Sequence, residues 1–221
     1  MLAGLFGGTF NPIHKGHLMV AEAVLGGLFL DRLYIIPCRE PPHKFPAYLA
    51  PAAERLQMIR LALPADSRYC VSEVEILRSG PSYTIDTVSH FMRAVLPGAI
   101  LFLVVGMDAF LEIHTWKSWR RLLETVQPVV VPRSVADRMP AADPVSRLDG
   151  YIRSRLSSDF RYVEKRSCWQ QAAGNRIHLL PMAAVDISSS QVRRRVRDGQ
   201  TIVGLVHPAV NAYIEKKELY R

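Results

Sequence analysis

Cysteine is scarce in this sequence. Only three of the 221 residues are cysteines, Cys38, Cys70 and Cys168, and no two of them form a Cys-x-x-Cys pair. An odd and scattered set argues against a disulfide framework and against a zinc site, and it fits a reducing compartment. We therefore expect three ordinary, partly buried cysteines in a cytoplasmic protein.

Long apolar runs are missing as well. A stretch such as residues 99–105 is far shorter than the roughly 20 apolar residues that a membrane-spanning helix needs. Residues 1–6 carry no positively charged side chain and lead straight into glycines, as a first strand would, so no secretory signal is expected. No repeat or linker divides the chain, which favours one domain over residues 1–221 with a closing helical segment at about 181–221.

Positive charge is what the sequence has in excess. Lysine and arginine number 28 against 20 acidic residues, a formal net charge of +8. This excess suits a nucleic-acid-binding protein, and equally a protein that binds small polyphosphates and is basic elsewhere, so charge alone does not decide. The densest cluster, Arg193 to Arg195 with Arg197, is interleaved with valine, which is typical of a helix with one apolar side.

The hydrophobic pattern indicates strands alternating with helices. Strands are expected at residues 2–6, 32–37, 71–77, 100–105, 126–131 and 177–180, and helices at 16–28, 51–62, 84–95, 189–197 and 208–216. Residues 134–175 are less regular; they predict a helix around 148–156 and no strong strand. The alternation predicts an α/β fold built on a single doubly wound parallel sheet.

The segment after the first strand carries the strongest chemical signal, and it reads GGTFNPIHKGH over residues 7–17. Glycines let the backbone approach a phosphate, a following helix offers free N–H groups, and His14 and His17 add donors. A tight turn with two satisfied histidines and a metal-binding histidine pair are the alternatives. The order of strand, glycines, histidines and helix favours a phosphate site, and no nearby cysteine or acidic residue completes a metal site. The sequence has no GxxxxGK[ST] and no GxGxxG, which weakens a P-loop or a hydride-transfer enzyme.

Two further segments follow strands. Residues 41–44 read PPHK, where Lys44 is a mobile charge that suits a phosphate, although a solvated lysine is the plainer reading. Gly106 and Asp108 follow the strand expected at 100–105, where glycine permits a turn and a carboxylate can accept ribose hydroxyls.

Two other segments begin helices. Residues 82–87 read SYTIDT, and the free N–H groups of a helix start suit a carboxylate, with simple capping as the alternative. Residues 187–193 read ISSSQVR, whose hydroxyls and final arginine suit a second phosphate clamp, with a capped surface helix as the alternative. Trp116 could pack in the core or stack on an aromatic ring, and Trp119 is expected in the core.

Taken together, these segments resemble the nucleotidylyltransferase superfamily. The stretch GTFNPIHKGH is similar to its (H/T)xGH motif, and the paired glycines with two histidines resemble the bacterial nicotinate-nucleotide adenylyltransferase family in particular. PPHK, SYTIDT, GMD followed by a tryptophan, and ISSSQVR resemble further motifs of that family, with Ser190 where threonine is usual and Val192 where isoleucine is usual. The similarity extends over the whole chain, except that residues 134–175 show no motif.

The resemblance implies a Rossmann-like nucleotidylyltransferase fold and transfer of AMP from ATP to nicotinate mononucleotide in NAD biosynthesis, with release of pyrophosphate. It implies four catalytic residues: His14, His17, Lys44 and Arg193. The implied ATP contacts are Gly7, Gly8, Thr9, Phe10, His14, His17, Gly106, Asp108, Ser188, Ser189, Ser190 and Arg193. The implied contacts to nicotinate mononucleotide are Thr9, Phe10, Lys44, Ser82, Tyr83, Thr84 and Trp116. Arg55 also fits the family pattern and is expected to be structural.

The expected partners are therefore the small molecules ATP and nicotinate mononucleotide, with Mg²⁺ held mainly by ATP phosphates and no metal site built by the protein. A phosphopantetheine adenylyltransferase or a cytidylyltransferase would share the first loop but not the other motifs together. A nucleic-acid-binding protein is the alternative from another class, and no stacking platform or recognition helix favours it. No membrane partner is expected, a homo-oligomer is possible, and the choice between nicotinate and nicotinamide mononucleotide stays open.

Overall fold

The computed structural model describes residues 1–39, 49–132, 143–180, 182 and 186–221. The chain forms two compact units whose segments alternate along the sequence. The first unit comprises Met1–Leu5, Ala23–Asp31 and Tyr83–Asp186, and the second unit comprises Phe6–Glu22, Arg32–Ser82 and Ile187–Arg221.

The strands belong to one eight-stranded sheet in the order β3-β2-β1-β4-β5-β8-β7-β6. The pairs β2 with β3, β4 with β5, and β5 with β8 are parallel, whereas β7 runs antiparallel to both of its neighbours. The prediction of an α/β fold is confirmed, but the sheet is mixed rather than wholly parallel. The strands are β1 (Leu2–Gly8), β2 (Arg32–Pro37), β3 (Tyr69–Val71), β4 (Ile100–Gly106), β5 (Gln127–Val131), β6 (Arg161–Val163), β7 (Cys168–Gln170) and β8 (Arg176–Leu179).

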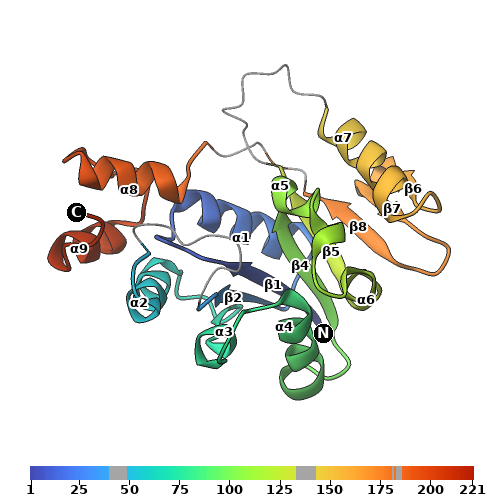
Figure 1. Ribbon diagram of the computed structural model, residues 1–221, viewed down its shortest axis with the longest axis horizontal. Helices are drawn as coiled ribbons and strands as arrows, with labels where there is room; N and C mark the ends of the chain where they lie inside the picture. Colours follow the sequence, from blue (N-terminus) through green and yellow to red (C-terminus); the bar gives the residue numbers. More distant parts are fainter. Residues whose placement is uncertain (40–48, 133–142, 181, 183–185) are drawn as a thin grey trace. The chain divides into compact units, whose positions relative to one another are not determined.

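In the first unit, helices cover the central strands. Helix α5 (Met107–Phe110) packs on β4 and β5, and helix α6 (Trp119–Thr125) packs on β5 and contacts α4 (Thr84–His90), as Figure 1 shows. A π-helical turn, Phe91–Val95, continues α4. Residues 101–105 of β4 are buried, as the continuous apolar run predicted.

The stretch without motifs contains more structure than the sequence indicated. Helix α7 (Pro144–Tyr151), with its π-helical continuation Ile152–Leu156, confirms the helix expected around 148–156. The expectation of no strong strand there is wrong, because β6 and β7 pair as a short antiparallel ladder. Each strand has only three residues, too few for a recognisable alternation. Trp169 of β7 is fully buried, and its Nε1 donates to Asp149 Oδ1 at 2.9 Å.

The second unit contains the loop after β1 and the helices α2 (Ala52–Ala62), α3 (Val74–Leu77), α8 (Ser189–Arg197) and α9 (Pro208–Lys216), of which α2 packs against α9 (Figure 1). Helix α1 (Lys15–Gly27) follows the loop. The strand expected at 71–77 is wrong beyond Val71, because β3 ends there and the next residues turn into α3. So short an apolar run fits either periodicity.

No helix in the described part of the chain is long and apolar enough to cross a membrane.

Candidate active site

The loop between β1 and α1 is shaped by close backbone packing. Phe10 adopts a positive φ of 47°, which folds its ring back onto the end of β1. A Cβ at Gly8 would lie 3.0 Å from that ring, so a larger residue there would displace the Phe10 ring and glycine fits best. Gly7 is different, since a Cβ there would meet nothing within 4 Å. Of the two glycines, only Gly8 therefore lies at a position where steric crowding favours glycine.

Arg55 of α2 holds this loop in place through hydrogen bonds. Its side chain is 0 % exposed, and its guanidinium donates to four backbone carbonyls: Thr9 at 2.7 Å, Cys38 at 2.8 Å, Arg39 at 3.0 Å and Ala50 at 3.0 Å. A planar fork of five N–H donors suits several fixed acceptors at once. The structure thus gives Arg55 a structural role, as the sequence analysis expected.

The two histidines of the loop lie face to face. The rings of His14 and His17 are stacked with their centroids 3.7 Å apart, and His14 is buried. The backbone N–H of His14 donates to Nδ1 of His17 at 3.2 Å. Because Nδ1 accepts this bond, the proton of the neutral His17 ring is on Nε2. His17 therefore has the tautomer in which Nε2 is a hydrogen-bond donor, as a phosphate oxygen requires.

Asn11 connects the loop to three other segments. Its Oδ1 accepts from the backbone N–H of Ala50 at 3.1 Å and from the hydroxyl of Tyr220 at 2.8 Å. Its backbone carbonyl accepts from Nη1 of Arg193 at 2.8 Å. Asn11 and Tyr220 could not be predicted as partners from the sequence, because nothing in a local motif indicates a contact roughly two hundred residues away.

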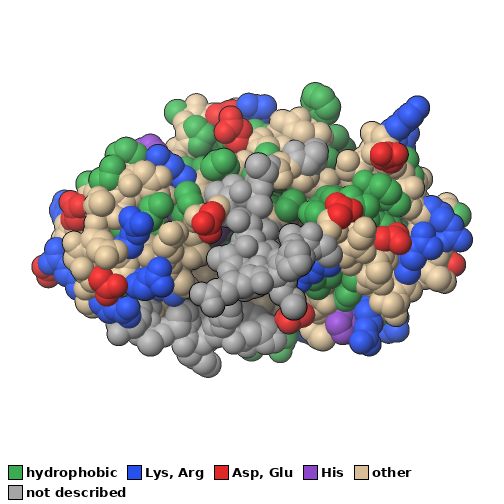
Figure 2. All heavy atoms as spheres, turned by 90° about the horizontal axis from the view of Figure 1, so that it is seen from above, with side chains coloured by type: hydrophobic (Ala, Val, Ile, Leu, Met, Phe, Trp, Pro, Cys, Tyr) green, Lys and Arg blue, Asp and Glu red, His purple; other side chains and the backbone are tan. Residues whose placement is uncertain are grey.

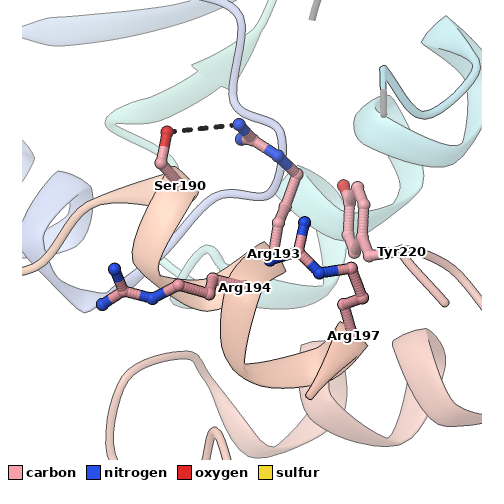
Figure 3. A pocket seen from close by; sticks show the side chains of 5 residues that line it. All are labelled: Ser190, Arg193, Arg194, Arg197 and Tyr220. Carbon is pink, nitrogen blue, oxygen red and sulfur yellow. Dashed lines mark hydrogen bonds between the residues drawn. The ribbon is translucent and has the colours of Figure 1, made fainter. Parts of the chain in front are cut away.

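The start of α8 lies directly against the loop. Ser188 and Gln191 form a capping box, since the Ser188 hydroxyl accepts from the Gln191 backbone and the Gln191 side chain accepts from the Ser188 backbone. Ser189 Oγ donates to the Pro12 carbonyl at 2.9 Å. Arg193 donates to Ser190 Oγ at 3.2 Å, as Figure 3 shows, and to Asn11 as described above. The two turns expected to hold phosphates are thus in contact within the second unit.

A pocket of about 210 Å³ opens beside this contact, lined by Ser190, Arg193, Arg194, Arg197 and Tyr220. Figure 3 shows Arg193 between Arg194 and Arg197, with Arg197 next to Tyr220. Burial lowers the pKa of Arg193 and raises the pKa of Tyr220, while the positive charge of Arg193 opposes the shift of the tyrosine. The pocket is therefore cationic, with a neutral phenol on one wall.

The Tyr220 hydroxyl leads to a stability prediction. Tyr220→Phe is expected to lower the free energy of unfolding at pH 7 by about 1 kcal/mol, because one buried hydrogen bond to Asn11 is lost. Burial favours the neutral phenol in the folded state, so wild-type stability is retained below the unfolded pKa of about 10 and declines as the pH rises above it.

Denaturant titrations between pH 7 and 11 test this. The decline above pH 10 is expected to be shallower in Tyr220→Phe than in wild type, with Tyr162→Phe of the first unit as the control for loss of a phenol. A variant whose pH dependence equals that of the wild type would contradict the prediction.

In the first unit, Lys117 contacts two residues at the beginning of α4, in the segment expected to bind nicotinate. Its Nζ lies 4.4 Å from the centroid of the Tyr83 ring and 3.1 Å from Asp86 Oδ2. Lys117 thereby links the beginning of α4 to the segment that carries Trp116, which is half-buried. Tyr83 is the N-cap of α4 and makes no side-chain capping bond, so capping by serine or threonine does not account for the SYTIDT segment.

Tyr151 of α7 holds the turn before Trp116. Its hydroxyl lies 2.8 Å from Nδ1 of His114 and accepts from the His114 backbone N–H at 3.4 Å. This contact was not predictable from the sequence, because α7 belongs to the stretch without motifs. Trp119 is half-buried beside Arg120, so its expected place in the core is wrong; Leu122 and Leu123 are the buried residues of α6.

The other expected site residues are placed as follows. Ser82, in the second unit, is buried, and its hydroxyl has no hydrogen-bond partner among the described residues. Gly106 is the N-cap of α5, and Asp108 is exposed in its first turn. Lys44 lies outside the described residues. Thr84 begins α4.

The structure bears on two alternatives from the sequence, a metal-binding site and a nucleic-acid-binding surface. The described residues contain no group of three or more His, Cys, Asp or Glu side chains placed to hold a metal ion. All three cysteines are free, and Cys38 and Cys168 are buried. On the face shown in Figure 2, lysine and arginine side chains are interspersed with acidic ones. Among the described side chains visible there, basic residues are mixed with acidic ones, which does not favour binding to a nucleic-acid backbone.

Comparison with known proteins gives consistent results. The model of the cytidylyltransferase-like family matches residues 5–195. A protein of Pelobacter propionicus described as a probable nicotinate-nucleotide adenylyltransferase is 39 % identical over 100 % of this chain and 98 % of its own length. A protein of Chromobacterium violaceum with the same description is 36 % identical over 99 % and 98 %. The Plasmodium falciparum nicotinic acid mononucleotide adenylyltransferase complexed with NaAD has a similar fold, with a TM-score of 0.74 at 18 % identity over 99 % of this chain and 96 % of that one.

Proposed function

Because the chain belongs to the cytidylyltransferase-like family, and within it to the nicotinate-nucleotide adenylyltransferases, we propose that it transfers AMP from ATP to nicotinate mononucleotide. The products are nicotinate adenine dinucleotide and pyrophosphate. The observation that carries the proposal is the contact between the histidine loop and α8, where Ser189 and Arg193 donate to the loop carbonyls.

The ATP phosphates are assigned to the second unit. Ser188, Ser189 and Ser190 begin α8, whose first N–H groups and positive dipole end favour an anion. Arg193 adds a permanent charge, and His17 Nε2 adds a donor whose tautomer is set by the His14 backbone. His14 packs against His17 and keeps that ring in place. Gly7, Gly8, Thr9 and Phe10 supply backbone contacts, and Gly106 with Asp108 contributes to nucleotide binding in the first unit.

The reaction is an in-line displacement at the α-phosphorus of ATP. A phosphate oxygen of nicotinate mononucleotide attacks, the bond to the bridging oxygen of the β-phosphate breaks, and pyrophosphate leaves with that oxygen. The attacking phosphate is already an anion, so no side-chain nucleophile or general base is needed. Catalysis then consists of positioning and of stabilising the charge on the phosphate oxygens, to which His14, His17, Lys44 and Arg193 are assigned.

We assign the binding of nicotinate mononucleotide to the residues that the motifs indicate for this substrate: Thr9, Phe10, Lys44, Ser82, Tyr83, Thr84 and Trp116. Trp116 offers a half-buried indole face for the pyridine ring, and Tyr151 supports its turn through His114. The hydroxyl of Ser82, buried without a partner among the described residues, is a donor that a bound ligand would satisfy.

Mg²⁺ enters with ATP as part of the substrate. The described residues contain no group of three or more His, Cys, Asp or Glu side chains that could hold a metal ion. We assign the ligands of Mg²⁺ to phosphate oxygens and water, which this ion commonly keeps. What the ion supplies is neutralisation of phosphate charge.

The test mixes the protein with ATP, Mg²⁺ and one mononucleotide at a time, and measures pyrophosphate and dinucleotide. Nicotinate mononucleotide is expected to give both products in equal amounts. Nicotinamide mononucleotide, phosphopantetheine and CTP with a phosphorylated alcohol are the comparison reactions. Pyrophosphate release with one of these substrates, and none with nicotinate mononucleotide, would contradict the proposal.

A further inference from the structure

The turn that carries Trp116 is restrained by Tyr151, a residue of α7 that belongs to none of the motifs. The 3₁₀ turn Ile113–Thr115 ends at Trp116, whose backbone N–H donates to the Ile113 carbonyl at 3.0 Å. His114, in the middle of this turn, contacts the Tyr151 hydroxyl through its backbone N–H at 3.4 Å and through Nδ1 at 2.8 Å. One phenol oxygen therefore restrains both the backbone and a side chain of the turn.

The phenol of Tyr151 is in the form that both contacts require. Burial raises its pKa, with a smaller opposing effect of the His114 backbone N–H that donates to it. The hydroxyl is therefore protonated at neutral pH. Its oxygen accepts from the His114 backbone, which leaves its own proton available to Nδ1, so the pair needs no charge on either ring.

The ring of Tyr151 has a partner of its own. It packs edge-on against Phe110, the fully buried last residue of α5, with the two ring centroids 5.9 Å apart. This apolar contact does not involve the hydroxyl. Tyr151→Phe therefore keeps the packing of α7 on α5 and removes only the hydrogen bonds to His114, which makes the role of the hydroxyl testable in a folded protein.

The other contacts of the turn leave the end that carries Trp116 less firmly held. Ile113 is fully buried and anchors the beginning of the turn. Lys117, the residue after Trp116, pairs with Asp86 at 3.1 Å, but both side chains are well exposed, so the pair contributes little. Its contact with the exposed Tyr83 ring is likewise open to water. Among the described polar contacts of this turn to other elements, those of Tyr151 are thus the better shielded.

We propose that Tyr151 is a positioning residue for the second substrate, because its hydroxyl fixes, through His114, the orientation in which Trp116 meets the pyridine ring of nicotinate mononucleotide. This inference rests on the proposed function and extends it to α7, outside the motifs. The contacts of Tyr151 given above include none of the residues assigned to the ATP phosphates. Tyr151 therefore acts on the affinity for the mononucleotide and not on the affinity for ATP.

Steady-state kinetics of Tyr151→Phe give the first test. The KM for nicotinate mononucleotide is expected to rise about fivefold, which corresponds to the loss of one partly buried hydrogen bond, while kcat and the KM for ATP stay within about twofold of wild type. Tyr162→Phe, which removes a phenol elsewhere in the first unit, is the control and is expected to match wild type. A fall in kcat alone, or equal rises in both KM values, overturns the inference.

Substitutions of His114 separate positioning from a general structural role. His114→Ala removes the acceptor of the Tyr151 hydroxyl and is expected to raise the KM for the mononucleotide as Tyr151→Phe does. His114→Asn is expected to recover part of the affinity, because its side-chain oxygen can accept in place of Nδ1. The double variant His114→Ala/Tyr151→Phe is expected to be no worse than either single variant, since both remove the same contact. Additive losses overturn the inference.

Acrylamide quenching of tryptophan fluorescence tests the position of Trp116 without any substrate. In a Trp119→Phe background the remaining tryptophans are Trp116 and the fully buried Trp169, so quenching reports on Trp116. Tyr151→Phe is expected to raise the quenching constant in this background, and Tyr162→Phe is expected to leave it unchanged. An unchanged constant in Tyr151→Phe overturns the inference. If the constant rises but wild type forms no dinucleotide, the proposed function fails and the restraint of Trp116 by Tyr151 is retained.

Discussion

Replacing His17 by alanine is expected to lower the turnover of dinucleotide formation by about 10²–10³-fold, the loss seen when one transition-state donor is removed. The reason lies in the tautomer of the ring. The His14 backbone N–H donates to Nδ1 of His17, so Nε2 carries the proton and is the donor that we assign to the phosphates. Alanine removes that donor and also the ring stacked on His14.

Steady-state kinetics with ATP and nicotinate mononucleotide measure this effect. His90→Ala, which removes an exposed histidine of α4, is the control and is expected to retain wild-type turnover. Thermal unfolding of both variants separates a loss of chemistry from a loss of fold. Turnover of His17→Ala within about threefold of wild type would remove this residue from the mechanism.

Arg55→Lys is expected to lower the free energy of unfolding by about 3–5 kcal/mol. The guanidinium satisfies four backbone carbonyls in a fully buried position, and the single nitrogen of lysine cannot reach all of them. A buried carbonyl without a hydrogen-bond donor lowers the free energy of unfolding, and the positive charge that lysine retains does not offset this loss. Because one of these carbonyls belongs to Thr9, the loop is also expected to be distorted. The rate of dinucleotide formation is therefore expected to fall as well.

Urea denaturation followed by circular dichroism is the measurement. Arg60→Lys is the matched control: it lies on the same helix and pairs with Glu73 at the surface, so its stability is expected to change by less than about 1 kcal/mol. Equal stabilities of Arg55→Lys and Arg60→Lys would show that the loop does not depend on the guanidinium fork.

The elements that the sequence predicted well have strong local signals. Helix α8 has a capping box and a long amphipathic pattern, α9 begins with a proline at its first turn, and both have the predicted bounds. Strand β2 is a compact apolar run and also has the predicted bounds. Where the local sequence signal was weak, pairing with other strands determined the secondary structure. Strands β6 and β7 have three residues each and are held by pairing with their neighbours.

In the candidate site too, local motifs were predictable and contacts between distant segments were not. The loop and the start of α8 were recognisable as motifs, because backbone approach and helix capping constrain residues near in sequence. Asn11, Tyr151 and Tyr220 were not, since each acts through one contact to a distant segment.

The hydrogen bonds of Asn11 have a consequence for how the protein acquires its activity. They join residue 11 to Ala50, Arg193 and Tyr220, and the last two of these closures span 182 and 209 residues. Contacts between such distant segments form late, because the entropy of closing a long chain must be overcome before they stabilise anything. A refolding chain can therefore regain most of its helix content while the loop after β1 is still unformed, and we expect enzymatic activity to return only with the final, global step.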